Sequence, residues 1–289
     1  MTTINNSNHP LTQIEAHRVC EGEQRVYEHR ATTLNCTMRF AIYLPQSSMA
    51  PVEKKLPVLF YLSGLTCSEQ NVIQKAGFQR FADQHQIMVV CPDTSPRGDG
   101  VADDERYWLG QGAGFYVNAT QAPWSTHYRM YDYITDELPT LIHQYFPTTG
   151  QQSITGHSMG GYGALLIGLK NPQNYQSISA FSPIVSPANS EWGQDTLPAY
   201  FGHDENDWQA VDPCALVKTS QAHRPILIDQ GDADNFLSNN LKTHLFEAAV
   251  RDVTSPVSIH LRPGYDHSYY FVQSFIDTHF AFHASYLHS

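Results

Sequence analysis

Apolar and polar residues alternate in the early part of the chain, with the period of two that is typical of half-buried strands. This alternation covers residues 22–29 and 37–44, and a polar, proline-bearing connector follows at residues 45–55. Residues 56–62 and 87–91 are instead continuously apolar, as expected of strands buried on both faces of a sheet. The pattern therefore predicts half-buried strands first and fully buried strands after them.

The second half of the chain alternates short apolar runs with segments of helical periodicity. The predicted strands there are residues 152–155, 177–181, 226–230 and 257–261. The predicted helices of the whole chain are residues 78–85, 128–146 with a kink at Pro139, 164–170, 238–250 and 269–286. Eight strands, antiparallel first and parallel afterwards with helices on both faces, predict an α/β-hydrolase fold.

The sequence predicts one domain over residues 1–289, because it shows no internal repeat and no linker that would divide it. Residues 92–125 form a long stretch rich in Gly, Pro and aromatic residues, and a loop of that length is usually functional. Residues 182–222 lie where folds of this kind carry insertions, so a small cap is predicted within them.

Composition limits the possible partners. The formal net charge of −11 argues against nucleic acid or an anionic membrane as the main partner. No apolar stretch approaches the ~20 residues of a membrane span, and the polar N-terminus shows no signal peptide. We therefore expect a cytoplasmic protein that acts on a small molecule.

Cysteine and histidine spacing gives no sign of a metal site. The five cysteines are Cys20, Cys36, Cys67, Cys91 and Cys214. They form no C-x-x-C pair and are expected to be reduced thiols. The 15 histidines include no H-E-x-x-H spacing. We expect neither a catalytic metal nor a cofactor.

The most informative motif is Gly-His-Ser-Met-Gly at residues 156–160, which follows a predicted strand and precedes a predicted helix. A serine at the apex of such a strand–turn–helix segment is a nucleophile elbow, in which Gly156 and Gly160 leave room for a strained turn. The motif predicts Ser158 as a nucleophile.

The partners of such a serine follow later in the chain, at the carboxyl ends of strands. The turn after residues 257–261 offers His267 as the base, and the turn after residues 226–230 offers Asp232 and Asp234. Asp234 is favoured because it lies further from the strand end, but the pattern leaves both open. A helix-capping aspartate and an ordinary loop histidine are the competing interpretations.

A Ser-His-Asp arrangement implies acyl transfer through an acyl-enzyme, with an oxyanion held by two backbone N–H groups. Met159, directly after the serine, is one expected donor. Leu65, in the turn after residues 56–62, is the other. Loss of one such donor typically costs ~3 kcal/mol of transition-state stabilisation.

Several blocks resemble S-formylglutathione hydrolases, also called esterase D. They are Leu-Ser-Gly-Leu-Thr-Cys-Ser-Glu-Gln at 62–70, Gly-Phe-Tyr-Val-Asn-Ala-Thr at 114–120, Gly-His-Ser-Met-Gly-Gly at 156–161, Asp-Gln-Gly at 229–231, and Gly-Tyr-Asp-His-Ser-Tyr-Tyr-Phe at 264–271. The resemblance implies cleavage of S-formylglutathione to glutathione and formate in formaldehyde detoxification. It also implies Ser158, Asp234 and His267 as the triad, Leu65 and Met159 as oxyanion donors, activity on short-chain esters, and a homodimer.

Four further residues are candidates for the substrate pocket. Modification of Cys67 would block the pocket, unless Cys67 is simply a small buried residue. Trp192 is either a wall of the acyl or glutathione site or a core residue. Arg97 and Lys75 could bind the substrate carboxylates, although a surface charge or a structural ion pair is the more common role of such residues.

Two other functions remain compatible with the sequence. One is a general short-chain carboxylesterase or an acyltransferase on the same scaffold. The other is a non-catalytic adhesion or scaffold protein of this fold, although such proteins generally lack a triad residue and this chain has all three candidates.

Overall fold

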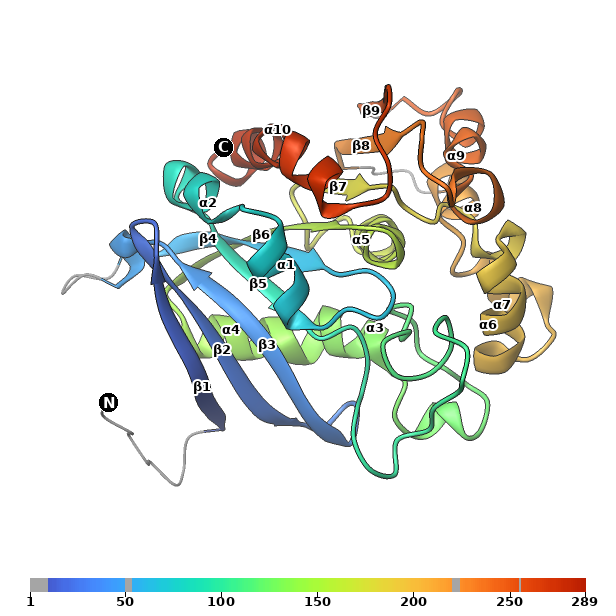
Figure 1. Cartoon of the computed structure of the whole chain (residues 1–289), viewed down its shortest axis with the longest axis horizontal. Helices are drawn as coiled ribbons and strands as arrows, with labels where there is room; N and C mark the ends of the chain where they lie inside the picture. Colours follow the sequence, from blue (N-terminus) through green and yellow to red (C-terminus); the bar gives the residue numbers. More distant parts are fainter. Residues whose placement is uncertain (1–9, 50–53, 220–223, 255) are drawn as a thin grey trace.

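The computed structural model describes residues 10–49, 54–219, 224–254 and 256–289. Within them the strand order of the sheet is β1-β2-β3-β5-β4-β6-β7-β8-β9 (Figure 1). The strands are β1 (Leu11–Val19), β2 (Gly22–Ala31), β3 (Cys36–Leu44), β4 (Leu56–Leu62), β5 (Met88–Pro92), β6 (Thr148–Gly156), β7 (Ile178–Phe181), β8 (Ile226–Gly231) and β9 (Val257–Arg262). Pairing is antiparallel from β1 to the β3–β5 pair and parallel elsewhere, which confirms the predicted α/β architecture.

The apolar strand β4 lies in the middle of the sheet and is buried along its whole length. Its alternate residues belong to two different cores. Val58, Phe60 and Leu62 join the core on one face, whereas Leu59 and Tyr61 join the core on the other. The continuous apolar run is therefore explained, because neither face of this strand meets water.

Helices cover both faces of the sheet. They are α1 (Glu69–Lys75), α2 (Gln79–His85), α3 (Met130–Asp132), α4 (Leu138–Tyr145), α5 (Met159–Lys170), α6 (Glu191–Phe201), α7 (Glu205–Gln209), α8 (Pro213–Thr219), α9 (Thr243–Ala249) and α10 (Tyr269–Leu287). Figure 1 shows α1, α2 and α10 together on one face, and their residues share a core. Residues of α4, α5, α8 and α9 belong to the core of the opposite face.

The predicted count of eight strands was wrong, because β1 was missed. This strand is mostly exposed and pairs only with β2, so it forms an edge of the sheet. Backbone hydrogen bonds to β2 hold this strand in the sheet, and such bonds require no pattern of apolar residues in the sequence. Helix α1 was also missed, although Ser68 and Asn71 form a capping box at its start.

Two predicted helices are irregular. The helix predicted over residues 128–146 winds through a π-helical turn, Tyr133–Glu137, directly before α4. Pro139 lies in the first turn of α4, and the wider winding before it accommodates a ring that would clash within a regular α-helix. The helix predicted over residues 238–250 is broken at Lys242, which has a φ of 53°.

The segment predicted as a cap contains α6, α7 and α8 between β7 and β8. Its last part, residues 220–222, lies outside the described residues, as does the N-terminal stretch 1–9 on which the signal-peptide prediction depends. Residues 93–123 form neither a helix nor a named strand, as the sequence indicated.

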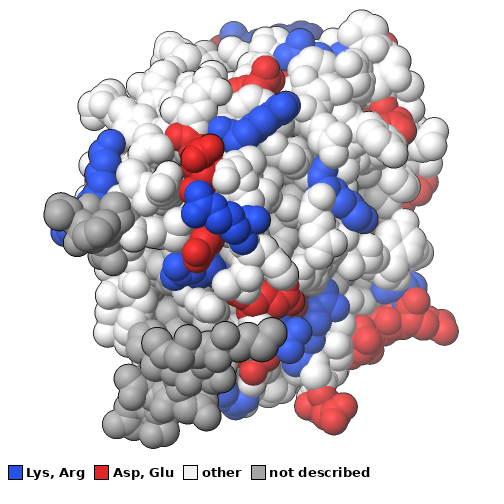
Figure 2. All heavy atoms as spheres, turned by 60° about the vertical axis from the view of Figure 1, so that its left-hand side comes forward, with Lys and Arg blue, Asp and Glu red and all other residues white. Residues whose placement is uncertain are grey.

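The surface in Figure 2 carries basic and acidic side chains interspersed with one another. On β2 and β3 they form pairs, with Arg25 2.8 Å from Glu23 and Arg39 3.1 Å from Glu28. Opposite charges on these two strands therefore offset each other locally. In the described part of the chain, no helix has the length and apolar character needed to cross a membrane.

Candidate active site

Ser158 occupies a strained turn between β6 and α5. Its φ of 61° and ψ of −121° lie outside the regions that a serine normally adopts. A Cβ added at Gly156 would lie 2.2 Å from the carbonyl oxygen of Gly160, and one at Gly160 would lie 1.9 Å from that of Leu62. Only glycine fits at these two positions, so the motif spacing matches the shape of the turn.

Backbone hydrogen bonds fix this turn between two strands. The N–H of His157 donates to the carbonyl oxygen of Leu62 at 3.0 Å, and that of Ser158 donates to Phe181 at 2.9 Å. Ser158 is only 4% exposed, and helix α5 begins at the next residue. The elbow is thus held at the carboxyl ends of β4, β6 and β7, where a parallel sheet opens.

Asp234 and His267 meet in the turns after β8 and β9. The Nδ1 atom of His267 lies 2.6 Å from Oδ2 of Asp234, whose side chain is fully buried. The same carboxylate accepts the backbone N–H of Phe236 at 2.9 Å and the amide of Gln230 at 3.3 Å. Because a carboxylate can only accept, the Nδ1 atom of His267 carries the proton, and its Nε2 atom is free to accept a proton.

Asp232 is placed differently, although it is only two residues away. Its Oδ1 accepts the backbone N–H of Gly264 at 2.7 Å in an exposed turn. Of the two aspartates that the pattern left open, Asp234 is therefore the one that contacts His267.

His267 lies against the nucleophile elbow and against the turn after β8. Its ring centroid is 4.6 Å from that of His157, which directly precedes Ser158, and 5.0 Å from that of Phe236. The side chain of His267 is 19% exposed. The candidate base therefore keeps an open side while two rings restrict its movement.

The turn after β4 approaches Ser158 from the other side. A Cβ added at Gly64 would lie 3.1 Å from Cβ of Ser158. The backbone N–H groups of Leu65 and Met159 donate to no group of the described residues. Met159 is also the first residue of α5, where N–H groups have no partner within the helix. Both groups are therefore available to an oxyanion.

The long segment after β5 braces this turn, which the sequence did not reveal. The carbonyl oxygen of Cys67 accepts from Thr94 Oγ1 at 2.5 Å and from Arg97 Nη2 at 2.8 Å. The carbonyl of Ser63 accepts from the buried hydroxyl of Tyr116 at 2.8 Å. These residues hold the turn at both ends, so the long loop supports the site.

Arg97 and Lys75, the candidates for binding substrate carboxylates, both contact other groups of the protein. Arg97 forms an ion pair of 2.9 Å with Asp93, a carboxyl group that is almost fully buried. Lys75 ends α1, and its Nζ atom lies 5.9 Å from the ring centroid of Tyr269. Of the roles considered for Arg97, the structure shows the structural ion pair.

Cys67 is partly buried in the same turn, and burial raises the pKa of its thiol. This places its pKa away from the low range of nucleophilic cysteines. Ser158 therefore remains the candidate nucleophile.

A groove of about 440 Å³ is lined in part by Phe236, whose ring contacts His267. Its lining residues are Tyr107, Trp108, Glu191, Trp192, Asp195, Asn235, Phe236, Asn239 and Asn240. The ring of Trp192 lies 5.0 Å from Phe236, which in turn contacts His267. Trp192 is 6% exposed, so it is both well buried and part of the groove wall.

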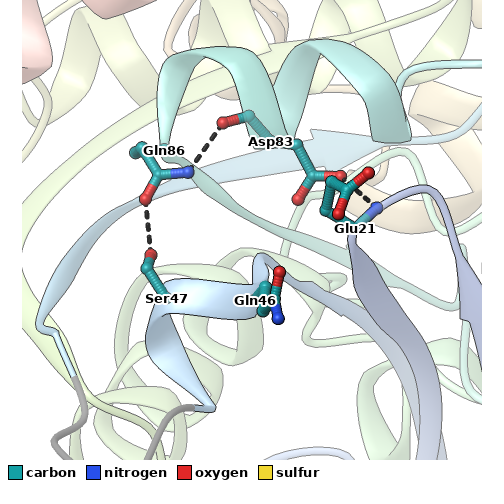
Figure 3. Close-up of a pocket in the computed structure, with 5 residues that line it drawn as sticks. All are labelled: Glu21, Gln46, Ser47, Asp83 and Gln86. Carbon is teal, nitrogen blue, oxygen red and sulfur yellow. Dashed lines mark hydrogen bonds between the residues drawn. The ribbon is translucent and has the colours of Figure 1, made fainter.

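A second hollow, of about 410 Å³, lies near the amino ends of β4 and β5 (Figure 3). Its walls bond to one another, with Gln86 linking Ser47 to the carbonyl of Asp83. It is lined by none of the candidate site residues, whereas Trp192 and Phe236 line the groove described above.

Comparison with known proteins agrees with this geometry. The Esterase family model matches residues 31–282. An S-formylglutathione hydrolase from Agrobacterium tumefaciens is 45% identical, with a TM-score of 0.92 over 95% of this chain and 99% of that one. The chain belongs to the esterase family of S-formylglutathione hydrolases. As a member of this family, it is a serine hydrolase.

Two more distant relatives share the fold of this esterase family. One is fluorophosphonate-binding serine hydrolase F from Staphylococcus aureus, at 23% identity and a TM-score of 0.73 over 92% of this chain and 99% of that one. The other is an S-formylglutathione hydrolase from Staphylococcus aureus, at 20% identity and a TM-score of 0.68 over 95% and 99% of the two chains.

Among the described residues of this esterase, no group of three or more His, Cys, Asp or Glu side chains could hold a metal ion. The side chains gathered around Ser158 are instead a base, a carboxylate and aromatic rings.

Proposed function

We propose that this protein hydrolyses S-formylglutathione to glutathione and formate, with Ser158 as nucleophile, His267 as base and Asp234 as the orienting acid. The observation that carries the proposal is the bond of 2.6 Å between His267 and the buried Asp234, beside the elbow that holds Ser158. The 45% identity to the Agrobacterium tumefaciens S-formylglutathione hydrolase supports the choice of substrate.

In the first step, Nε2 of His267 takes the proton of Ser158 as Oγ attacks the thioester carbonyl. The N–H groups of Leu65 and Met159 stabilise the oxyanion, and the buried carboxylate of Asp234 stabilises the imidazolium. The C–S bond breaks and His267 returns the proton to the glutathione sulfur. Water then attacks the formyl-enzyme with His267 as base, releasing formate and restoring Ser158.

The groove lined by Trp192 and Phe236 fits the leaving group better than the acyl group. A formyl group has only two heavy atoms, whereas the groove has a volume of about 440 Å³. Ligand pockets typically have volumes of about 300–1,000 Å³. We therefore assign Trp192 and Phe236 to the wall that contacts the glutathionyl group, with Cys67 near the acyl side.

Kinetics with two substrates test the proposal. We expect kcat/KM for S-formylglutathione to exceed that for 4-nitrophenyl acetate by a large factor, because the groove contacts only the larger leaving group. A preference for the simple ester would favour a general short-chain carboxylesterase. Labelling of the protein by a fluorophosphonate should disappear in Ser158→Ala, and a wild-type protein that is not labelled would contradict the triad.

The proposal extends to assembly, location and pathway. We propose a homodimer in the cytoplasm that acts in formaldehyde detoxification, with one domain and a small cap within residues 182–222. Light scattering of the purified protein should give twice the monomer mass of 32.5 kDa. A single monomeric species at micromolar concentration would contradict the dimer.

A further inference from the structure

His157 directly precedes the nucleophile, and its side chain lies against the candidate base. Its ring centroid is 4.6 Å from that of His267, with the two ring planes tilted by 37°. The ring centroid of Tyr269, at the start of α10, lies 5.6 Å from that of His157. His157 is 5% exposed, so this ring fills the space between the elbow and the turn that carries His267.

The backbone of His157 cannot move without moving the elbow. Its N–H donates to Leu62, its carbonyl accepts from Gly160 at 2.8 Å, and it forms an isolated bridge with Phe181. These contacts tie the residue to β4, α5 and β7. The Cα of His157 is therefore held in place, so its ring can support another ring.

The imidazole of His157 is suited to packing rather than to proton transfer. Its Nε2 atom is buried and has no partner among the described residues. Burial lowers the pKa of His157 well below its ordinary range and the positive charge of His267 lowers it further, whereas a hydrogen bond to the backbone of His267 acts in the opposite direction. No carboxylate contributes to that pKa, so the ring stays neutral when His267 is protonated.

We propose that His157 is a positioning residue, whose buried ring supports His267 and keeps water from that face of the base. Phe236 and Asp234 restrict His267 at two other places, through a ring contact and the hydrogen bond at Nδ1. The elbow thus positions both Ser158, the proposed nucleophile, and His157, which supports the proposed base. This inference rests on the proposed roles of Ser158 and His267.

The test compares His157→Ala with His157→Phe, using 4-nitrophenyl acetate over pH 5 to 9. In His157→Ala we expect kcat to fall about 10- to 100-fold with little change in KM, because the base is no longer held in place. Water that reaches His267 solvates its charged form, so the acidic limb of the kcat/KM profile moves to higher pH. His157→Phe restores a ring and should recover most of the rate and the original limb.

His244→Ala, an exposed histidine on α9, is the matched control and should leave kcat and the pH limb unchanged. An unshifted limb and a kcat within twofold of wild type in His157→Ala would overturn the proposal. If circular dichroism shows that His157→Ala is unfolded, His157→Asn replaces it. Equal kcat values for His157→Asn and His157→Phe would then overturn the proposal.

This test is separate from the substrate assignment. A wild-type protein that hydrolyses 4-nitrophenyl acetate but not S-formylglutathione contradicts the proposed substrate and leaves the test of His157 intact. A wild-type protein that is inert to both esters and to fluorophosphonate contradicts the proposed function itself, and this inference falls with it.

Discussion

The two sides of Ser158 are built in different ways. On the side of β8 and β9, side chains make the contacts of the proposed triad, with Asp234 bonded to His267 and two rings packed on that histidine. On the side of β4, the proposed oxyanion donors are the backbone N–H groups of Leu65 and Met159, for which no acceptor is found among the described residues. We name these the relay side and the oxyanion side.

The difference determines what each side requires from the sequence. The relay side needs particular residues, because only an imidazole and a carboxylate can carry its chemistry. The oxyanion side needs a particular backbone shape, and its other residues act by holding that shape. Thr94, Arg97 and Tyr116 do so through the carbonyl groups of Cys67 and Ser63.

The largest expected effect lies on the relay side. Asp234→Asn should lower kcat by about 10⁴, because the amide can stabilise the wrong tautomer of His267. Asp232→Asn is the matched control. It should change kcat less than about threefold, since the asparagine oxygen can still accept from Gly264. Measurement of kcat with 4-nitrophenyl acetate decides, and the reverse order would identify Asp232 as the acid.

A smaller effect is expected where the two sides meet. In Gly64→Ala the new methyl group would lie 3.1 Å from Cβ of Ser158 and 3.3 Å from the carbonyl oxygen of His157. The oxyanion turn must then move by a few tenths of an ångström, and we expect kcat to fall about 10- to 100-fold. A variant with the wild-type melting temperature and the wild-type kcat would show that the turn tolerates displacement.

A still smaller effect is expected from the brace. Arg97→Lys keeps a positive charge beside Asp93 but loses the guanidinium fork that also reaches Cys67. We expect kcat to fall about tenfold at constant KM, because one oxyanion donor is held less firmly. Arg39→Lys, the same change in an exposed ion pair, is the control. An equal fall in kcat in both variants would contradict a role of the Arg97–Cys67 bond in catalysis.

Two sets of buried groups, histidines of the elbow and α10 and carboxyl groups at Asp93 and Glu69, should respond to pH in opposite directions. Burial lowers the pKa of His157, His279 and His283. The unfolded chain therefore binds more protons below about pH 6.5, and each of these histidines costs up to about 1.4 kcal/mol of stability per pH unit there. Burial instead raises the pKa of Asp93 and Glu69, so protonation of these carboxyls favours the folded state.

The three buried histidines should lower stability from about pH 6.5 downward, because the unfolded chain begins to bind protons at these histidines there. Denaturant unfolding should therefore show stability falling as the pH drops below about 6.5. Stability that stays constant or rises over this range would show that the buried histidines are charged in the folded protein.

Much of the relay side was predictable from the sequence. The glycines around Ser158 reveal a turn without room for side chains, and the turns after β8 and β9 revealed Asp234 and His267. Such local patterns survive in the sequence because each strand and its following turn are contiguous. The choice between Asp232 and Asp234 was not contained in the pattern, since both lie in the same turn.

The brace of the oxyanion side could not be predicted from spacing. Thr94 and Arg97 lie 27 and 30 residues from Cys67, and Tyr116 lies 53 residues from Ser63. Their segment has no regular periodicity, so nothing local fixes its path. The edge strand β1 was missed for a related reason, because its pairing with β2 depends on backbone groups that every residue carries.

The sequence by itself determined the buried strands, the elbow and the set of candidate side chains, because short-range geometry and hydrophobic period dictate them. Only the tertiary structure decided that Asp234 meets His267, that Arg97 pairs with Asp93, and that His157 packs on the base. Those contacts join residues far apart along the chain. They form only when the parallel sheet brings the carboxyl ends of its strands to one edge.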